Sequence, residues 1–225
     1  MAAIIERLLG KEQVQQVLQM MQGAQFRHGS ESAGPLGQNL KIKDNVEIAP
    51  GNAGHREISD MVLATMQRNE RFKLAAVPRR ILPPLFSCYG EGQYYGAHVD
   101  SALMGPFPGL RSDLSITIFL APPESYDGGE LIIESEFGEH SYKLPAGDAI
   151  VYPTHYLHRV TQVTRGQRLA AVTWIESMVP DPAKRRILVE LAELMGWMMQ
   201  TNADAKSLKK LEKTRLNLLR MWVDT

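Results

Sequence analysis

The sequence predicts a mainly β protein with helical flanks, whose core is an antiparallel sandwich or barrel. Three observations lead to this class. Short runs suited to β-strands follow one another through residues 79–178. Turn signals made of glycine, proline and aspartate separate these runs, and no helical pattern lies between them. Apolar residues at helical spacing occur instead on the two sides, in residues 1–78 and 179–225.

The N-terminal region, residues 1–78, is predicted to be helical and loop-rich and to pack on the core. Apolar residues at helical spacing favour two short helices within residues 4–21, separated by Gly10. The segment 23–37 is rich in glycine and serine and is expected to form loops. Residues 56–72 again show a helical apolar stripe. This region is therefore expected to cover the β core.

The central region, residues 79–178, carries the expected strands of the core. In chain order these runs are Leu114–Leu120, Leu131–Glu134, Ala149–Tyr152, His158–Val163 and Leu169–Ile175. Successive side chains of a strand point to opposite faces, so Ser115, Thr117 and Phe119 share one face. We expect this face to look into the barrel and to pack there, with a hydroxyl group able to touch a bound ligand.

The C-terminal region, residues 179–225, is predicted to form helices at 183–199 and 205–223. The second helix is basic, with six lysine and arginine residues against one glutamate between Lys206 and Arg220. A solvated helix face is the favoured interpretation, and we expect no nucleic-acid partner. A terminal helical arm beside a closed β domain also predicts a homo-oligomer formed through these helices.

Composition restricts the function classes further. The chain has 225 residues, of which 44% are hydrophobic, and its 25 basic residues balance 25 acidic ones. Zero net charge provides no overall field that would attract nucleic acid or an anionic membrane. The single cysteine, Cys88, cannot form an intrachain disulfide. With no secretory signal pattern and no long apolar stretch, we expect a cytoplasmic protein without a membrane partner.

Two histidines and a carboxylate are the candidate metal ligands. His98 and Asp100 stand two residues apart, so in a strand both side chains point to the same face. His158 begins a later predicted strand and supplies a second imidazole. Two histidines and one carboxylate are the facial triad of non-haem Fe(II) oxygenases. Arg168, ten residues after His158, could bind the far carboxylate of an anionic chelator.

A second pair of residues offers a competing assignment, shifted by three positions. His155 and Arg165 are also ten residues apart. Pro153 and Thr154 place His155 in a turn, however, and Arg165 reads as part of a hairpin turn, where side chains point to solvent. His158 with Arg168 is therefore the favoured pair, and His155 could still line the mouth of the pocket.

The order of the motifs carries a more specific resemblance. The run Tyr89-Gly-Glu-Gly-Gln-Tyr-Tyr-Gly-Ala-His98-Val-Asp100 resembles the Tyr-x-x-Gly-Gln-x-Tyr-x-x-His-x-Asp pattern of prolyl 4-hydroxylase-type dioxygenases. The later motifs Asp127-Gly-Gly-Glu-Leu131, Lys143-Leu-Pro-Ala-Gly-Asp148, Leu157-His-Arg-Val160 and Thr164-Arg-Gly-Gln-Arg168 follow in the family's order. The whole run resembles the bacterial PKHD-type hydroxylases, a subgroup associated with iron uptake.

This resemblance implies a double-stranded β-helix, or jelly roll, over residues 79–178. It implies that His98, Asp100 and His158 bind Fe(II), and that Arg168 anchors the cosubstrate 2-oxoglutarate. Tyr89 matches a position near the cosubstrate. The implied reaction uses O2 to hydroxylate a substrate while 2-oxoglutarate is converted to succinate and CO2, and L-ascorbate is an optional reductant.

The substrate and two other functions stay open at this point. The substrate could be a protein residue or a small molecule such as a siderophore, and the resemblance points to iron homeostasis. One alternative is a catalytically silent sensor or scaffold that binds metal and 2-oxoglutarate. The other is a cupin-like metal enzyme, for which Arg168 would have no purpose.

Overall fold

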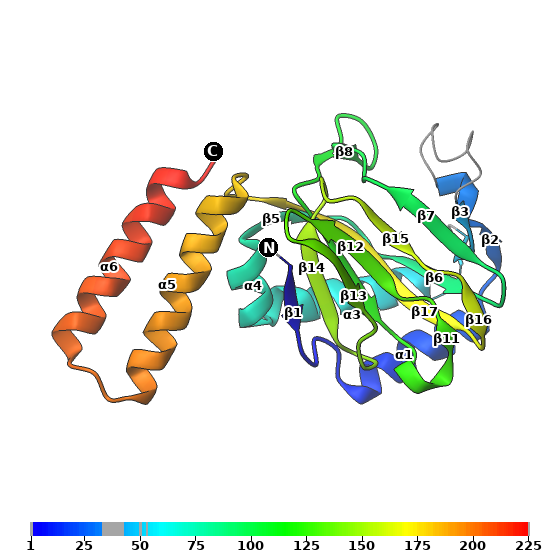
Figure 1. Ribbon diagram of the computed structural model, residues 1–225, viewed down its shortest axis with the longest axis horizontal. Helices are drawn as coiled ribbons and strands as arrows, with labels where there is room; N and C mark the ends of the chain where they lie inside the picture. The colour runs from blue at the N-terminus through cyan, green and yellow to red at the C-terminus, as the bar shows by residue number, and fades with distance from the viewer. Residues whose placement is uncertain (1, 33–42, 50, 53, 225) are drawn as a thin grey trace.

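The protein consists of two facing antiparallel β-sheets, with helices on the outside and a helical hairpin at one side (Figure 1). The computed structural model describes residues 2–32, 43–49, 51–52 and 54–224. Two antiparallel sheets that enclose an interior between them are the arrangement of a jelly roll. The fold class expected from the sequence, mainly β with helical flanks, is confirmed.

The larger sheet forms one wall of the interior. Its strands, in spatial order, are β1 (Ala3–Ile5), β14 (Ala149–Pro153), β10 (Leu114–Phe119), β17 (Arg168–Ser177), β6 (Leu85–Tyr89), β4 (Val46–Ile48) and β2 (Phe26–His28), and β5 (Pro78–Ile81) pairs with β17. The opposite wall is a five-stranded sheet of β13 (Gly138–Tyr142), β12 (Leu131–Ser135), β15 (His158–Val160), β7 (Tyr94–His98) and β3 (Lys43–Asp44). Two short pairs, β8 (Leu103–Met104) with β9 (Leu110–Arg111) and β11 (Asp127–Gly128) with β16 (Val163–Arg165), complete the described strands.

Two apolar layers hold this arrangement together. Helices α1 (Lys11–Gln22), α3 (His55–Arg68) and α4 (Glu70–Ala76) pack on the outer face of the larger sheet. Short 3-10 turns occur at Gly29–Ser32 and Pro123–Ser125. In β10, Ile116 and Ile118 point toward these helices, whereas Phe119 packs in the second layer, between the sheets. Because side chains alternate along a strand, Ser115 and Thr117 face the interior with Phe119, as predicted.

The N-terminal region differs from its prediction in two places. The first expected helix is wrong, because Ala3–Ile5 forms strand β1 at the edge of the larger sheet, in register with β14. The expected loop over 23–37 contains strand β2, which pairs with β4, and its residues 33–37 lie outside the described residues. In both places, hydrogen bonding to an open sheet edge overrides local propensity. The division of the chain at residues 78 and 178 stays a prediction, although β1 to β4 belong to the core sheets.

Two later elements are interrupted where one was expected. The helix predicted for 56–72 splits at Asn69, whose side chain accepts a hydrogen bond from the Phe72 amide and so begins α4. The run 158–163 divides into β15 and β16, which belong to different sheets. The other four predicted strand runs are confirmed, with their ends shifted by a residue or two.

The C-terminal region forms the two predicted helices, α5 (Pro182–Gln200) and α6 (Ala205–Trp222). They make a hairpin that extends away from the sheets and meets the rest of the chain mainly at α4 (Figure 1). No residue of α6 is buried. None of the described helices is long and apolar enough to cross a membrane.

Candidate metal and cosubstrate site

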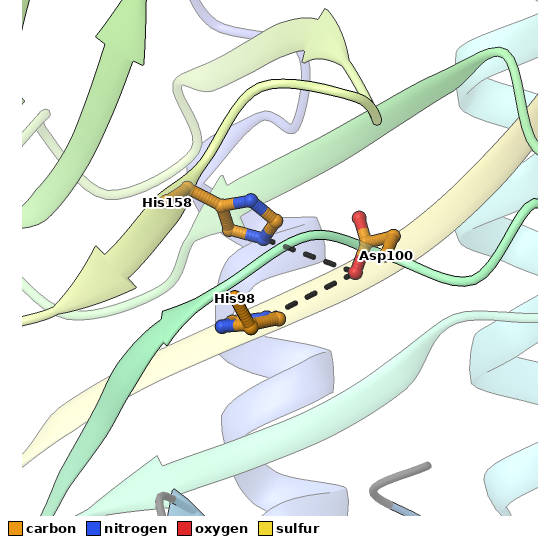
Figure 2. Close-up of side chains that lie close together, drawn as sticks. All are labelled: His98, Asp100 and His158. Carbon is orange, nitrogen blue, oxygen red and sulfur yellow. Dashed lines mark ion pairs between the residues drawn. The ribbon is translucent and has the colours of Figure 1, made fainter. Parts of the chain in front are cut away.

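Neighbouring strands of the smaller sheet bring the two candidate histidines together. His98 ends β7 and His158 begins β15, and these two residues are direct partners in the antiparallel ladder. Asp100 follows β7 by two residues and lies beside both rings (Figure 2). The three side chains therefore meet although 60 residues of sequence separate the two histidines.

The three side chains aim their polar atoms at one point. Asp100 Oδ1 lies 3.9 Å from His98 Nε2 and 3.8 Å from His158 Nε2 (Figure 2). One ligand atom from each residue lies within 4.8 Å of the others. Ligands that each sit about 2 Å from one metal ion lie about 3–4 Å apart, which matches the two carboxylate–imidazole distances. The spacing therefore fits a single ion held by one carboxylate oxygen and two imidazole nitrogens.

Backbone carbonyl groups fix the orientation of both rings. His98 Nδ1 lies 2.8 Å from the Gly96 carbonyl oxygen, and His158 Nδ1 lies 3.0 Å from that of Tyr156. A carbonyl oxygen only accepts hydrogen bonds, so Nδ1 must carry the proton in both rings. Nε2 is then left with its lone pair free to bind a metal.

The electrostatic setting also favours neutral imidazole at His98. Burial, followed by the proximity of His158, lowers the pKa of His98 well below its usual value. The Tyr95 ring stacks on His98 with 3.7 Å between ring centres. A metal would therefore not need to displace a proton from His98 near neutral pH.

Ser115 supports the third candidate ligand from the opposite sheet. Its hydroxyl donates a hydrogen bond to Asp100 Oδ2, the oxygen that faces away from the two histidines. The sequence placed Ser115 on the inner face of its strand and suggested contact with a ligand. The structure instead gives Ser115 the carboxylate of Asp100 as its partner, which the sequence did not indicate. Such a bond orients a metal-binding carboxylate.

Replacing Ser115 with alanine is expected to weaken Fe(II) binding by about 10- to 100-fold, because Asp100 loses the bond that orients it. Anaerobic Fe(II) titration measures this affinity. Ser177→Ala is the matched control, since Ser177 is also fully buried but donates to the Ala76 carbonyl oxygen, away from the site. Equal Fe(II) affinities in the two variants would show that Ser115 does not position the carboxylate.

Arg168 is a buried cation that the described residues leave without an acidic partner. Only 2% of its surface is exposed, and its Nε makes no hydrogen bond within the described chain. Its guanidinium carbon lies over the rings of Tyr89 and Phe119, 5.1 and 5.6 Å from their centres. A buried charge without a counterion is costly. The site is therefore suited to an anionic ligand, and a carboxylate matches the guanidinium best.

The predicted turn at Asp127-Gly-Gly makes room for this arginine. Gly128 and Gly129 have φ values of 70° and 67°, in the left-handed region that glycine adopts without strain. A Cβ atom on Gly129 would lie 3.1 Å from Arg168 Cδ. The second glycine therefore lets Arg168 lie close to the turn.

One cavity of about 380 Å³ joins these groups. His98, Asp100, His158, Arg168 and Tyr89 all line it. Its volume is within the range of small-molecule sites. Arg168 is thus placed to hold a carboxylate at one end of a ligand while the other end of that ligand reaches the three converging side chains.

The competing assignment finds no support in this arrangement. His155 lies in an exposed turn and does not line the cavity. Arg165 is exposed and forms an ion pair with Asp127 at 2.7 Å. The structure brings together His158 and Arg168 and leaves His155 and Arg165 outside.

The fold and the site define a non-haem dioxygenase that takes an anionic chelating cosubstrate, and comparison with known proteins agrees. Residues 84–176 match the family model of the 2OG-Fe(II) oxygenase superfamily. A prolyl-4-hydroxylase of Pseudomonas putida has a similar fold, with a TM-score of 0.52 and 20% identity over 78% of this chain and 92% of that one. The enzyme is an oxidoreductase that uses Fe(II), 2-oxoglutarate and O2.

Full-length relatives define the family more narrowly. A PKHD-type hydroxylase of Synechococcus sp. (strain JA-2-3B'a(2-13)) is 42% identical over 100% of both chains. Another, from Stenotrophomonas maltophilia (strain K279a), is 41% identical over 97% of both. The chain belongs to the PKHD-type hydroxylases.

Proposed function

We propose that this dioxygenase hydroxylates its substrate at an iron held by His98, Asp100 and His158. Arg168 binds the distal carboxylate of 2-oxoglutarate, and Tyr89 packs against that arginine. The observation that carries the proposal is that three converging ligand atoms and a buried arginine without an acidic partner in the described chain line one cavity. Bound Fe(II) supplies the redox chemistry that couples decarboxylation of 2-oxoglutarate to insertion of oxygen into a C–H bond.

The residues of the chain supply orientation and shielding. The carbonyl groups of Gly96 and Tyr156 hold Nδ1 of each histidine, which orients the ring so that Nε2 is the atom directed toward Asp100. Ser115 holds the outer oxygen of the Asp100 carboxylate. Burial of Arg168 removes water from its guanidinium, so that its interaction with a carboxylate is stronger than at the surface.

The test is anaerobic addition of Fe(II) and 2-oxoglutarate, followed by O2. We expect the visible charge-transfer band of a chelated iron complex, and then succinate. If folded protein gives no such band, the proposed site is wrong. A band that never gives succinate, with or without candidate substrates, would favour the sensor alternative for this chain.

We further propose a role in iron homeostasis, which rests on the likeness of the whole motif run to the iron-uptake-associated subgroup. Extracts of iron-limited and iron-replete cells, each incubated with the enzyme and 2-oxoglutarate, test this role. A product heavier by one oxygen atom is expected preferentially in the iron-limited extract. Equal amounts in the two extracts would contradict the link, and the product's nature would separate a protein substrate from a siderophore-like molecule.

The remaining expectations stay predictions. A cytoplasmic location is supported by the single cysteine, Cys88, which is a buried free thiol. A homo-oligomer through the C-terminal helices is supported by exposed apolar side chains on them, with Trp197, Met199 and Met221 exposed by 61%, 59% and 74%. The expectation that nucleic acid and membranes are not partners rests on the balanced charge.

A further inference from the structure

A buried ion pair closes one edge of the cavity. Lys43 lies on β3 of the smaller sheet and Glu47 on β4 of the larger one. The chain crosses from one sheet to the other between Asp44 and Val46. Lys43 Nζ is 2.5 Å from Glu47 Oε1, and the two side chains are only 8% and 3% exposed. Both residues line the cavity that holds the metal site. No motif in the sequence pointed to them.

This pair is close to the candidate metal ligands. Lys43 Nζ lies 5.0 Å from the centre of the Tyr95 ring, and that ring stacks on His98. Arg168 lies on β17, and strand β6 separates it from β4, which carries Glu47. A molecule bound at Lys43 and Glu47 would therefore approach the metal from the β3–β4 edge, without occupying the place of a ligand at Arg168.

The pair has hydrogen-bonding capacity that the described residues leave unused. Lys43 donates to Ser32 Oγ at 2.7 Å and to Glu47 Oε1, so one of its three N–H groups is free of these contacts. Glu47 Oε2 is buried and accepts no hydrogen bond from the described chain. A buried carboxylate oxygen without a donor is unfavourable. The pair is thus able to donate one hydrogen bond and to accept another.

We propose that Lys43 and Glu47 form a substrate subsite for a primary carboxamide. This subsite rests on the function proposed above. The carbonyl oxygen of such a group accepts from Lys43, and one N–H donates to Glu47 Oε2. A primary carboxamide presents its carbonyl and the syn N–H along one edge, which is why glutamine and asparagine side chains make paired hydrogen bonds.

The charge balance of the pair favours this ligand over a charged one. One lysine and one glutamate in contact have no net charge, so a bound carboxylate or ammonium group would bring an uncompensated charge into a buried site. A ketone would leave the Glu47 oxygen without a donor. The apolar side chains Leu85 and Val172, which also line the cavity, suit the carbon skeleton of the ligand.

Three small probes of the same size test the subsite by ligand-observed NMR. They are butyramide, butyrate and 2-pentanone, added to protein saturated with Zn(II) and 2-oxoglutarate so that Arg168 is already engaged. Butyramide is expected to bind at least about tenfold more tightly than the other two, because only it satisfies both partners. Similar binding of all three probes would overturn the subsite.

A peptide source and a small-molecule source of the carboxamide are separated by a fourth probe, N-acetyl-glutamine N-methylamide. Tighter binding of this probe than of butyramide indicates a glutamine-like side chain as the natural ligand, and equal or weaker binding indicates a small molecule. Either result requires the carboxamide preference to be present.

The double variant Lys43→Met with Glu47→Leu separates a subsite from a purely structural ion pair. Replacing a buried ion pair by apolar residues of similar size generally preserves the fold. We expect the preference for butyramide over 2-pentanone to disappear. It should persist in Glu70→Gln, which removes one partner of the exposed pair of Glu70 with Lys73. A preference that survives in the double variant would overturn the subsite.

Binding of 2-oxoglutarate itself keeps the two proposals distinguishable. If wild-type protein with Zn(II) does not bind 2-oxoglutarate, the proposed metal and cosubstrate site fails. If it binds 2-oxoglutarate but shows no preference among the probes, only the carboxamide subsite fails.

Discussion

Arg168→Met is expected to weaken 2-oxoglutarate binding by at least about 30-fold while largely sparing Fe(II) binding. Losing a buried, hydrogen-bonded charge from such a pair costs about 2–5 kcal/mol, and 1.4 kcal/mol corresponds to a factor of ten. Methionine keeps an apolar side chain against the rings of Tyr89 and Phe119, so the packing of the cavity is expected to be preserved. The measurement is calorimetric titration with 2-oxoglutarate in the presence of a divalent metal.

The stability of the ligand-free variant provides a second check of this role. In the described chain the Arg168 charge has no acidic partner, so removing it should not lower the unfolding temperature appreciably. Arg165→Met is the control, because Arg165 is exposed and pairs with Asp127, and it should bind 2-oxoglutarate like the wild type. Unchanged cosubstrate affinity in Arg168→Met would mean that the anchor lies elsewhere.

His158→Ala is expected to lower Fe(II) affinity by more than about 100-fold and to abolish succinate formation. Even residues that only orient metal ligands change affinity by about 10- to 100-fold when they are replaced, and a direct ligand should exceed that range. His158 is only 5% exposed, so circular dichroism must show that the variant is folded. Anaerobic Fe(II) titration and a succinate assay measure the two effects.

His155→Ala is the matched control for this prediction. His155 is three residues away along the chain, exposed, and outside the cavity. It should leave Fe(II) affinity and succinate formation at wild-type levels. Equal losses in the two histidine variants would contradict the ligand assignment, and Asp100→Ala, which removes the carboxylate, provides an independent measurement of the same site.

The candidate site could be predicted from sequence because its residues occupy fixed positions in short motifs. His98 and Asp100 are two residues apart, and side-chain alternation places such residues on one face. His158 and Arg168 lie in motifs that follow one another in the family's order. Turn signals identified His155 and Arg165 as exposed. Each motif can be recognised locally, although only the pairing of β7 with β15 brings His98 and His158 together.

The elements that the sequence did not predict depend on contacts between distant segments. Ala3–Ile5 has helical spacing but forms β1, because the backbone of β14 offers it an unfilled sheet edge. Lys43 and Glu47 are four residues apart, a spacing typical of a helix-surface ion pair. They instead join two sheets, because the chain crosses from one to the other between them.

The sequence by itself determined the β core with helical flanks and the hydroxylase family, and it supplied the proposed set of iron and cosubstrate residues. Periodicity encodes the core and its flanks, and the resemblance of the ordered motifs to the family supplies the rest. Only the tertiary structure decided that Ser115 holds Asp100, that Arg168 is buried without an acidic partner in the described chain, and that Lys43 and Glu47 line the same cavity. The physical reason is that burial and hydrogen bonding across two sheets depend on which distant residues become neighbours, and that pairing is established only when the sheets close on each other.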